Sequence, residues 1–145
     1  MTKASTAPPL TTLEAVIDSI PTQIWQMSYD CTYGRVNAAH AAFLGKTREQ
    51  IELQPLESVL PPGEAASAIT LTRNAFDAKH ALETEQWRPD AAGKRRLLRV
   101  TMTPTTDAAS GVQFLSCTAE DITAQWEAER ELQLCRESID DQVTQ

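Results

Sequence analysis

The second half of the chain is dominated by apolar residues at every second position, and this pattern restricts the fold more than any other feature. Residues 81–89, 95–104 and 112–119 show strand character of this kind, and turn signals separate them. The turns end on Gly93 and Gly111, which can adopt a positive φ. Short turns join antiparallel neighbours, so the pattern predicts three consecutive antiparallel strands.

The last of these strands, residues 112–119, is apolar on both faces. Such a strand should be covered on both sides. Counting along it places Phe114 on the face away from the core. We expect the helix predicted at the start of the chain, from the same or a partner subunit, to cover this side chain.

The start of the chain has the residue spacing of a helix. Thr11 and Glu14 form a capping box, apolar residues follow at helical intervals, and Pro21 ends the run. Residues 1–10 are small, polar and proline-bearing, so we expect a flexible N-terminus there. Residues 11–21 are expected to form a short flanking helix.

The segment between this helix and the strands of the second half mixes two periods. Apolar residues alternate over 22–29, and a short strand is expected at 35–37. The alanine-rich run 38–44 predicts a helix that Gly45 ends, and a Thr47–Gln50 capping box opens a short helix that Pro55 ends. A longer helix is expected over residues 64–78.

Residues 123–142 contain neither proline nor glycine and predict one long helix. A heptad seam suited to a weak coiled coil runs along it through Ala128, Leu132, Cys135 and Ile139. Residues 120–145 carry 8 acids and 2 bases, a net charge of −6 out of −7 for the whole chain. The acidity therefore belongs to this helix, and the rest of the chain is nearly neutral.

Five short segments occur in an informative order: 36–45, 47–51, 87–94, Pro104 and 120–123. In this order they resemble the motifs of PAS sensor domains. The last one, with Asp121, Ile122 and Thr123, resembles the Asp-Ile-Thr motif that ends a PAS core and opens a signalling helix.

The resemblance covers roughly residues 11–130 and implies an α+β fold. The expected fold is a five-stranded antiparallel sheet in the order 2-1-5-4-3 with helices on one face, an N-terminal flanking helix and a C-terminal signalling helix. The core would span residues 22–122 and the signalling helix residues 123–145. The resemblance also implies a homodimer and a C-terminal effector domain in the same polypeptide.

A pocket between the sheet and the helices is implied as well. The candidate lining residues are Trp25, Met27, Tyr29, Phe43, Leu60, Ile69, Phe76, Leu98, Val100, Met102, Leu115 and Cys117. Since nearly all are apolar, any ligand would be a small, largely apolar molecule. A filled core without a ligand is the alternative.

The side chains that could bind a cofactor argue against haem, flavin and a metal ion. Haem needs an axial imidazole in an apolar cavity; of the two histidines, His40 and His80, we take His80 as the better candidate, although a surface or core histidine is far commoner. Light-sensing PAS domains carry a reactive cysteine where residues 53–57 have none, which excludes a covalent flavin adduct and disfavours flavin. Three dispersed cysteines without a C-x-x-C motif indicate no metal site.

Other functional classes lack their signatures. No nucleophile–base order or phosphate loop appears, and Glu83 and Glu85 are better explained as cross-strand partners of the arginines at 95–99, so we expect no enzyme. The acidic balance argues against nucleic-acid binding. No apolar run of membrane-spanning length and no signal peptide occur, and the cysteine pattern fits the cytoplasm.

The sequence therefore predicts a sensory PAS domain that relays a signal by dimer or helix rearrangement, with a histidine kinase as the expected effector. A diguanylate cyclase or a transcription regulator would use the same connection. A stand-alone protein-interaction scaffold, which needs neither ligand nor effector, is the alternative of a different class.

Overall fold

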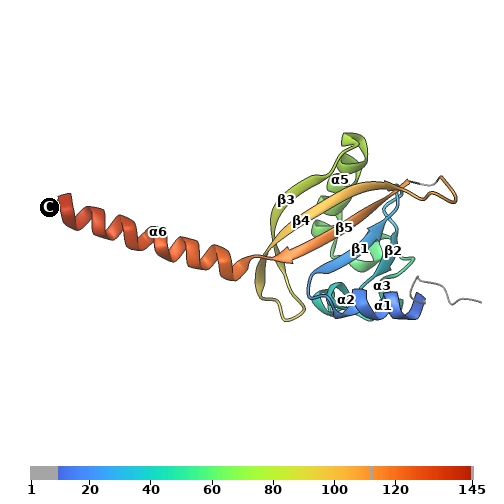
Figure 1. The fold of residues 1–145 in the computed structure, drawn as a ribbon, viewed down its shortest axis with the longest axis horizontal. Helices are drawn as coiled ribbons and strands as arrows, with labels where there is room; N and C mark the ends of the chain where they lie inside the picture. Colours follow the sequence, from blue (N-terminus) through green and yellow to red (C-terminus); the bar gives the residue numbers. More distant parts are fainter. Residues whose placement is uncertain (1–9, 112, 145) are drawn as a thin grey trace, which may run out of the picture.

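The computed structural model describes residues 10–111 and 113–144. Its centre is a single antiparallel sheet with the strand order β2-β1-β5-β4-β3, as expected (Figure 1). The strands are β1 (Gln23–Met27), β2 (Tyr33–Val36), β3 (Leu82–Pro89), β4 (Arg95–Thr106) and β5 (Gln113–Asp121). Neighbouring β3, β4 and β5 form the predicted run of consecutive antiparallel strands.

Along the chain, helices come before β1, between β2 and β3, and after β5. They are α1 (Leu10–Ser19), α2 (Ala38–Leu44), α3 (Arg48–Ile51), α4 (Leu56–Val59), α5 (Pro62–Ala78) and α6 (Thr123–Thr144). The four helices α2 to α5 connect β2 to β3 and cover one face of the sheet, while α6 leaves the end of β5 and extends away from the core (Figure 1). Within the described ranges, no helix combines the length and the apolar character needed to cross a bilayer.

The register of the sheet places the core. Trp25 on β1 pairs with Cys117 on β5, and Cys117 pairs with Met102 on β4. All three side chains are buried against the helices. Because side chains alternate along a strand, Leu115 is buried on the same face, whereas Phe114 on the other face is only half-buried.

The local signals act at the helix ends where they were expected. Gly45 ends α2 with a φ of 68°, and its N–H bonds the carbonyls of Ala41 and Ala42. Thr47 and Gln50 form the capping box of α3. The short helix α4 was not expected: α3 already ends at Ile51, and Pro55 directly precedes α4 instead of ending a helix.

The start of the chain differs in part from expectation. Helix α1 begins at Leu10, and the expected flexible N-terminus and the side chains of the Thr11–Glu14 capping box lie outside the described residues. α1 lies beside α2 and α3 (Figure 1), and Asp18 near its end bonds Ala38 and Arg48. Phe114 instead borders a surface hollow with Gln26 and Thr106, and no described side chain of α1 lines this hollow, contrary to the expectation that α1 covers Phe114.

Candidate functional site

A cavity of about 50 Å³ lies between the inner face of the sheet and helices α2, α4 and α5. Seven of the expected lining residues border it: Trp25, Met27, Phe43, Leu60, Leu98, Val100 and Met102. The polar part of its lining was not anticipated and consists of Gln23, Tyr33, His40, Thr72, Gln86 and Arg88. The cavity is therefore apolar over most of its wall, with polar groups contributed by β1, β2, α2, α5 and β3.

The other five expected residues do not border this cavity. Leu115 and Cys117 are fully buried in the core along β5, Phe76 is buried on α5, and Ile69 is half-buried. Tyr29 is 60% exposed and touches Phe76 edge-on. Alternation places Tyr29 wrongly because β1 ends at Met27 and the chain then turns.

His40 is the buried histidine of this site, with 4% of its surface exposed. Its ring stacks on Trp25 with 4.3 Å between centroids, and its Nδ1 lies 2.9 Å from the Gln23 Oε1. Burial, with a smaller contribution from the positive charge of Arg88, lowers the pKa of His40 to about 3. The imidazole is therefore neutral at physiological pH.

The ranking of the two histidines is reversed by the structure. His80 lies exposed after α5, where its Nδ1 contacts the Ala81 carbonyl. His40 faces the cavity because it stands three residues before Phe43 on the same face of α2. That spacing, together with the expectation that Phe43 closes the pocket, is the signal that could have identified His40.

The size of the cavity restricts what it can hold. One water needs roughly 10–15 Å³ of such volume, so 50 Å³ accommodates a molecule of only a few non-hydrogen atoms. A haem or a flavin ring system does not fit this space in the conformation described. In the part of the chain that the structure describes, no three His, Cys, Asp or Glu side chains are grouped so that they could hold a metal ion.

Asn37 joins the start of α2 to the preceding elements. Its Oδ1 accepts from the backbone N–H of Ile24 at 2.9 Å and from that of His40 at 3.1 Å. Its Nδ2 donates to the carbonyls of Thr22 at 2.9 Å and Ile17 at 3.2 Å. One buried amide therefore connects α1, β1 and the helix that carries His40.

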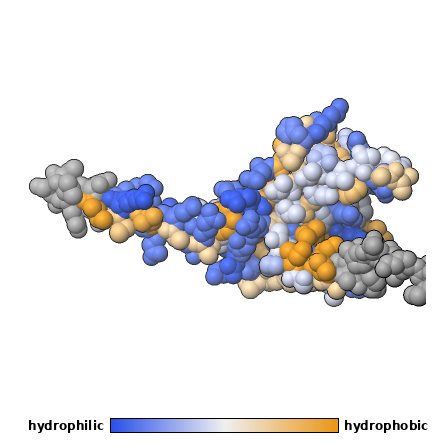
Figure 2. All heavy atoms as spheres, viewed as in Figure 1, coloured by the Kyte–Doolittle hydropathy of each residue, from blue (hydrophilic) through white to orange (hydrophobic). Residues whose placement is uncertain are grey.

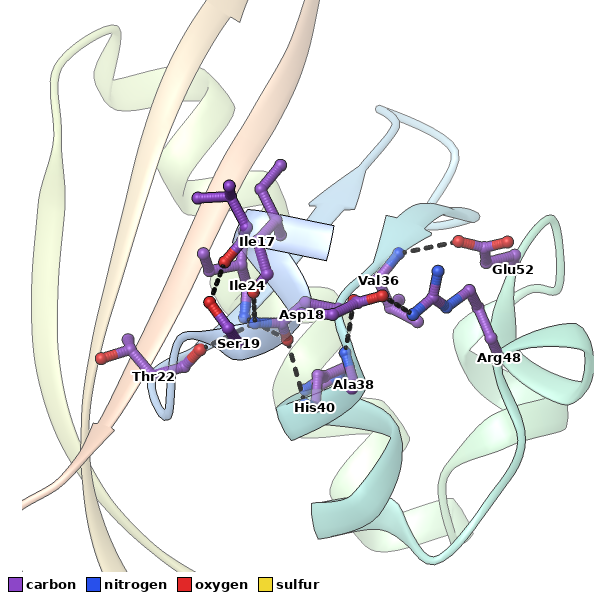
Figure 3. Close-up of polar contacts among 12 residues, drawn as sticks. Ile17, Asp18, Ser19, Thr22, Ile24, Val36, Ala38, His40, Arg48 and Glu52 are labelled. Atoms are coloured by element: carbon purple, nitrogen blue, oxygen red, sulfur yellow. Dashed lines mark hydrogen bonds and ion pairs between the residues drawn. The ribbon is translucent and has the colours of Figure 1, made fainter. Parts of the chain in front are cut away.

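Asp18 provides a second connection between α1 and the helices (Figure 3). Its carboxylate accepts from the Ala38 N–H at 3.0 Å and from the Arg48 Nη2 at 2.5 Å. The bond from Arg48 holds the pKa of Asp18 below its ordinary value. The C-terminal end of α1 is thus fastened to α2 and α3 by polar contacts.

The expected signalling motif forms the junction between the sheet and α6. The Ile122 N–H donates to the Leu97 carbonyl at 2.9 Å, and the Thr123 Oγ1 accepts from the Leu97 N–H at 2.8 Å. The Thr123 hydroxyl donates to the Asp121 Oδ1 at 2.5 Å. Ile122 and Thr123 are both buried, so the first turn of α6 is held directly to β4, next to the cavity residue Leu98.

Beyond this junction α6 contacts the core through Trp126. Trp126 packs edge-on against Trp87 of β3, with 5.0 Å between ring centroids. After that turn the side chains of residues 127–139 are exposed, including the four seam residues Ala128, Leu132, Cys135 and Ile139. Figure 2 shows apolar patches along this otherwise hydrophilic helix.

The two strand carboxylates have the partners that were expected. Glu83 and Glu85 on β3 lie 3.7 and 3.6 Å from the guanidinium of Arg99 on β4. Glu120 on β5 is the third acidic neighbour of Arg99, at 3.8 Å. These groups form a cross-strand ion-pair cluster on a partly exposed part of the sheet.

A sheet in this order, with short helices enclosing a cavity on one face and a long helix leaving the last strand, is the architecture of a small α+β sensory domain. The chain belongs to the PAS fold family, which matches residues 17–127. No curated protein sequence matches the chain.

Solved structures agree on the fold at low sequence identity. The PAS domain of BvgS from Bordetella pertussis superposes with a TM-score of 0.66 at 18% identity, over 89% of this chain and 97% of that one. A PAS domain from Colwellia psychrerythraea gives a TM-score of 0.62 at 16% identity, over 79% and 98%. The VqmA dimer of Vibrio cholerae, described as a LuxR-type receptor, gives 0.70 at 17% identity, over 80% of this chain and 53% of VqmA. The match thus spans about half of the VqmA chain.

Proposed function

We propose that this PAS domain senses a small ligand in its cavity, forms a homodimer and passes its state along α6 to a C-terminal effector, a histidine kinase. The domain itself is non-catalytic in this proposal and acts in the cytoplasm. Its three cysteines, all free thiols, are compatible with a reducing compartment.

The observation that carries the proposal is the junction at Thr123. Leu97 bonds Ile122 and Thr123 through both of its backbone groups, and the next residue, Leu98, borders the cavity. A ligand that displaces Leu98 would therefore shift the anchor of α6 without any intermediate element. Packed elements with few alternative arrangements convert small shifts of this kind into discrete changes.

The dimer part of the proposal rests on the exposed seam of α6. Leu132 and Ile139 are each 53% exposed in the single chain, and a second copy of the helix would bury them. The acidic residues beside the seam repel their counterparts in a second copy, so the pairing would be marginal and would strengthen with salt. A marginal pairing suits a switch, because a small shift at the junction is then enough to change it.

A structural neighbour supports the ligand part. VqmA has been solved bound to DPO and in a complex with ligand and DNA. Those observations concern VqmA, and they show that this fold occurs in a ligand-binding receptor. For the effector of the present chain, the support is the resemblance of the terminal Asp-Gln-Val-Thr-Gln to linkers between PAS domains and histidine kinases.

Sedimentation tests the dimer. The chain of residues 1–145 is expected to dimerise more strongly as salt concentration rises, and a chain ending at Arg130, which keeps the Thr123 junction and the Trp126 contact, is expected to be mainly monomeric. Equal dimerisation of the two chains would show that the seam does not hold the subunits together.

A chimera tests the relay. Residues 1–145 are fused in heptad register to the catalytic region of a histidine kinase, and autophosphorylation is measured for the wild type and for Thr123→Val. The matched control is Thr118→Val, because Thr118 is half-buried on the face of β5 that points away from the helices. We expect only Thr123→Val to change kinase activity; equal activity of all three chimeras would contradict the relay. Reading the residues that follow Gln145 distinguishes a kinase from a cyclase, a regulator or a stand-alone scaffold.

A further inference from the structure

Two buried polar atoms, each on a residue that borders the cavity, lack a hydrogen-bond partner. Among the described residues, these are the His40 Nε2 and the Thr72 Oγ1. His40 is 4% exposed and Thr72 is fully buried, on α2 and α5 respectively. Native proteins pair nearly all of their buried polar groups, so two unpaired atoms on residues of one cavity wall indicate a group that bonds them there.

The hydrogen bond of the other ring nitrogen defines what the His40 Nε2 can do. Nδ1 lies 2.9 Å from the Gln23 Oε1, which is an acceptor, so Nδ1 carries the proton of the neutral ring. Nε2 then has a lone pair and can only accept a hydrogen bond. The Thr72 hydroxyl can either donate or accept. The pair therefore matches a ligand group that contains an N–H or O–H donor.

The charge around the cavity favours an uncharged ligand. Arg88 is the one cationic residue in the cavity lining, and its guanidinium is already engaged: Nε donates to the Gln86 Oε1 at 3.0 Å and Nη1 lies 3.8 Å from the Glu64 carboxylate. The rest of the wall is largely apolar, with side chains such as Met27, Leu98 and Val100. An ionised ligand would lose its hydration there without gaining a free counter-charge.

We propose that the cavity takes a small uncharged molecule, of the amide or alcohol class, whose N–H or O–H donates to the His40 Nε2 and whose polar group also bonds the Thr72 Oγ1. Its apolar remainder would lie against Met27 and Leu98. This inference rests on the proposed sensing function and specifies the ligand class for the same site.

The test uses three probes of similar size on residues 1–145. N-methylacetamide offers an N–H donor and a carbonyl acceptor, methyl acetate keeps the shape but lacks the donor, and propionate carries a charge. Long-range ¹H–¹⁵N spectra report the protonation and hydrogen bonding of each imidazole nitrogen. We expect N-methylacetamide to shift the His40 Nε2 resonance and to bind about tenfold more tightly than the other two probes, the effect of about one hydrogen bond.

Variants separate the two contacts. Thr72→Val is expected to weaken the binding of N-methylacetamide about fivefold to tenfold. His40→Phe is expected to abolish the protein's preference for N-methylacetamide over methyl acetate. Thr70→Val is the matched control, because Thr70 lies on the same helix, is exposed and bonds the Ala66 carbonyl. Thr72→Val should melt no lower than the wild type, since it replaces an unpaired hydroxyl with a methyl group of the same shape.

Three outcomes would overturn the ligand class. One is a protonated His40 Nε2 in the free protein. Another is equal binding of methyl acetate or tighter binding of propionate. The third is contact of Nε2 with water alone at every probe concentration. None of them bears on the chimera, whose kinase readout tests the relay separately.

Discussion

His40 and Trp25 lie face to face in the wall of the cavity, with ring planes inclined by 15° and centroids 4.3 Å apart. The contact joins the helix α2 to the central part of the sheet. It also removes the imidazole from water, and this burial keeps the ring neutral.

The neutral state of His40 predicts a pH dependence of stability. Its folded pKa of about 3 lies below the unfolded value of about 6.5, so the unfolded chain binds a proton that the folded chain does not. The stability that the fold gains from keeping His40 neutral is therefore complete above pH 6.5 and is lost as the pH falls from there towards 3. Between pH 7 and pH 5 we expect a loss of about 2 kcal/mol in the free energy of unfolding, measured by urea denaturation.

The control for that measurement is a pair of substitutions. His40→Phe should remove this part of the slope, while His80→Gln should keep it because His80 is exposed. The restriction to pH 7–5 keeps carboxylate titration small. A wild-type slope retained in His40→Phe would show that another group is responsible.

Asn37 is expected to be the most sensitive polar position of the core. Asn37→Ala removes two acceptor and two donor contacts of a side chain that is 1% exposed, and we expect a loss of about 2–4 kcal/mol in the free energy of unfolding. Asn37→Asp keeps the cap of α2 but cannot donate to Ile17 and Thr22. Amide exchange in α1 should therefore rise in both variants, while α2 should be less affected in Asn37→Asp.

Asp18→Asn is expected to loosen α1 with little effect on the core. Both side chains of the Asp18–Arg48 pair are about one-third exposed, so the cost should stay below about 1 kcal/mol. The pKa of Asp18 is lowered in the fold, so its contribution is present above the unfolded pKa and is lost as the pH falls through the folded value. Faster exchange of the amides at residues 15–19, without a change in the α5 amides, is the expected result.

The junction at Thr123 predicts a spectroscopic change. Thr123→Val leaves the buried Leu97 N–H without an acceptor, at a cost of about 1–3 kcal/mol, and frees the first turn of α6. The Trp87–Trp126 pair should then separate, with loss of exciton coupling in circular dichroism. Trp126→Leu supplies the spectrum without this pair; a Thr123→Val spectrum identical to the wild type would show that the hydroxyl does not position α6.

Much of the fold could be predicted because its signals are local. Alternation marked the strands of the second half, Gly45 ended α2, and the Thr47–Gln50 capping box opened α3. The strand order came from the resemblance of ordered motifs to PAS domains. The helix α4 escaped prediction because four residues provide too little periodicity to distinguish a helix from a loop.

The candidate site was predictable only in part. Alternation identified Trp25, Met27, Leu98, Val100 and Met102 as cavity residues, since a strand's period determines which side chains share a face. It failed for Tyr29, where the strand had already ended. It also could not rank His40 above His80, because burial of a histidine depends on which distant segments pack around it.

By itself, the sequence determined most of the elements, the buried faces of the central strands and the acidic character of α6, because propensity, capping and periodicity act between residues a few positions apart. Tertiary structure decided where the wall of the cavity is polar, that Asn37 connects α1 to α2, and that Thr123 fastens α6 to β4. These features depend on hydrogen bonds between residues far apart in the chain, and only the packed arrangement of helices and sheet brings their donors and acceptors together.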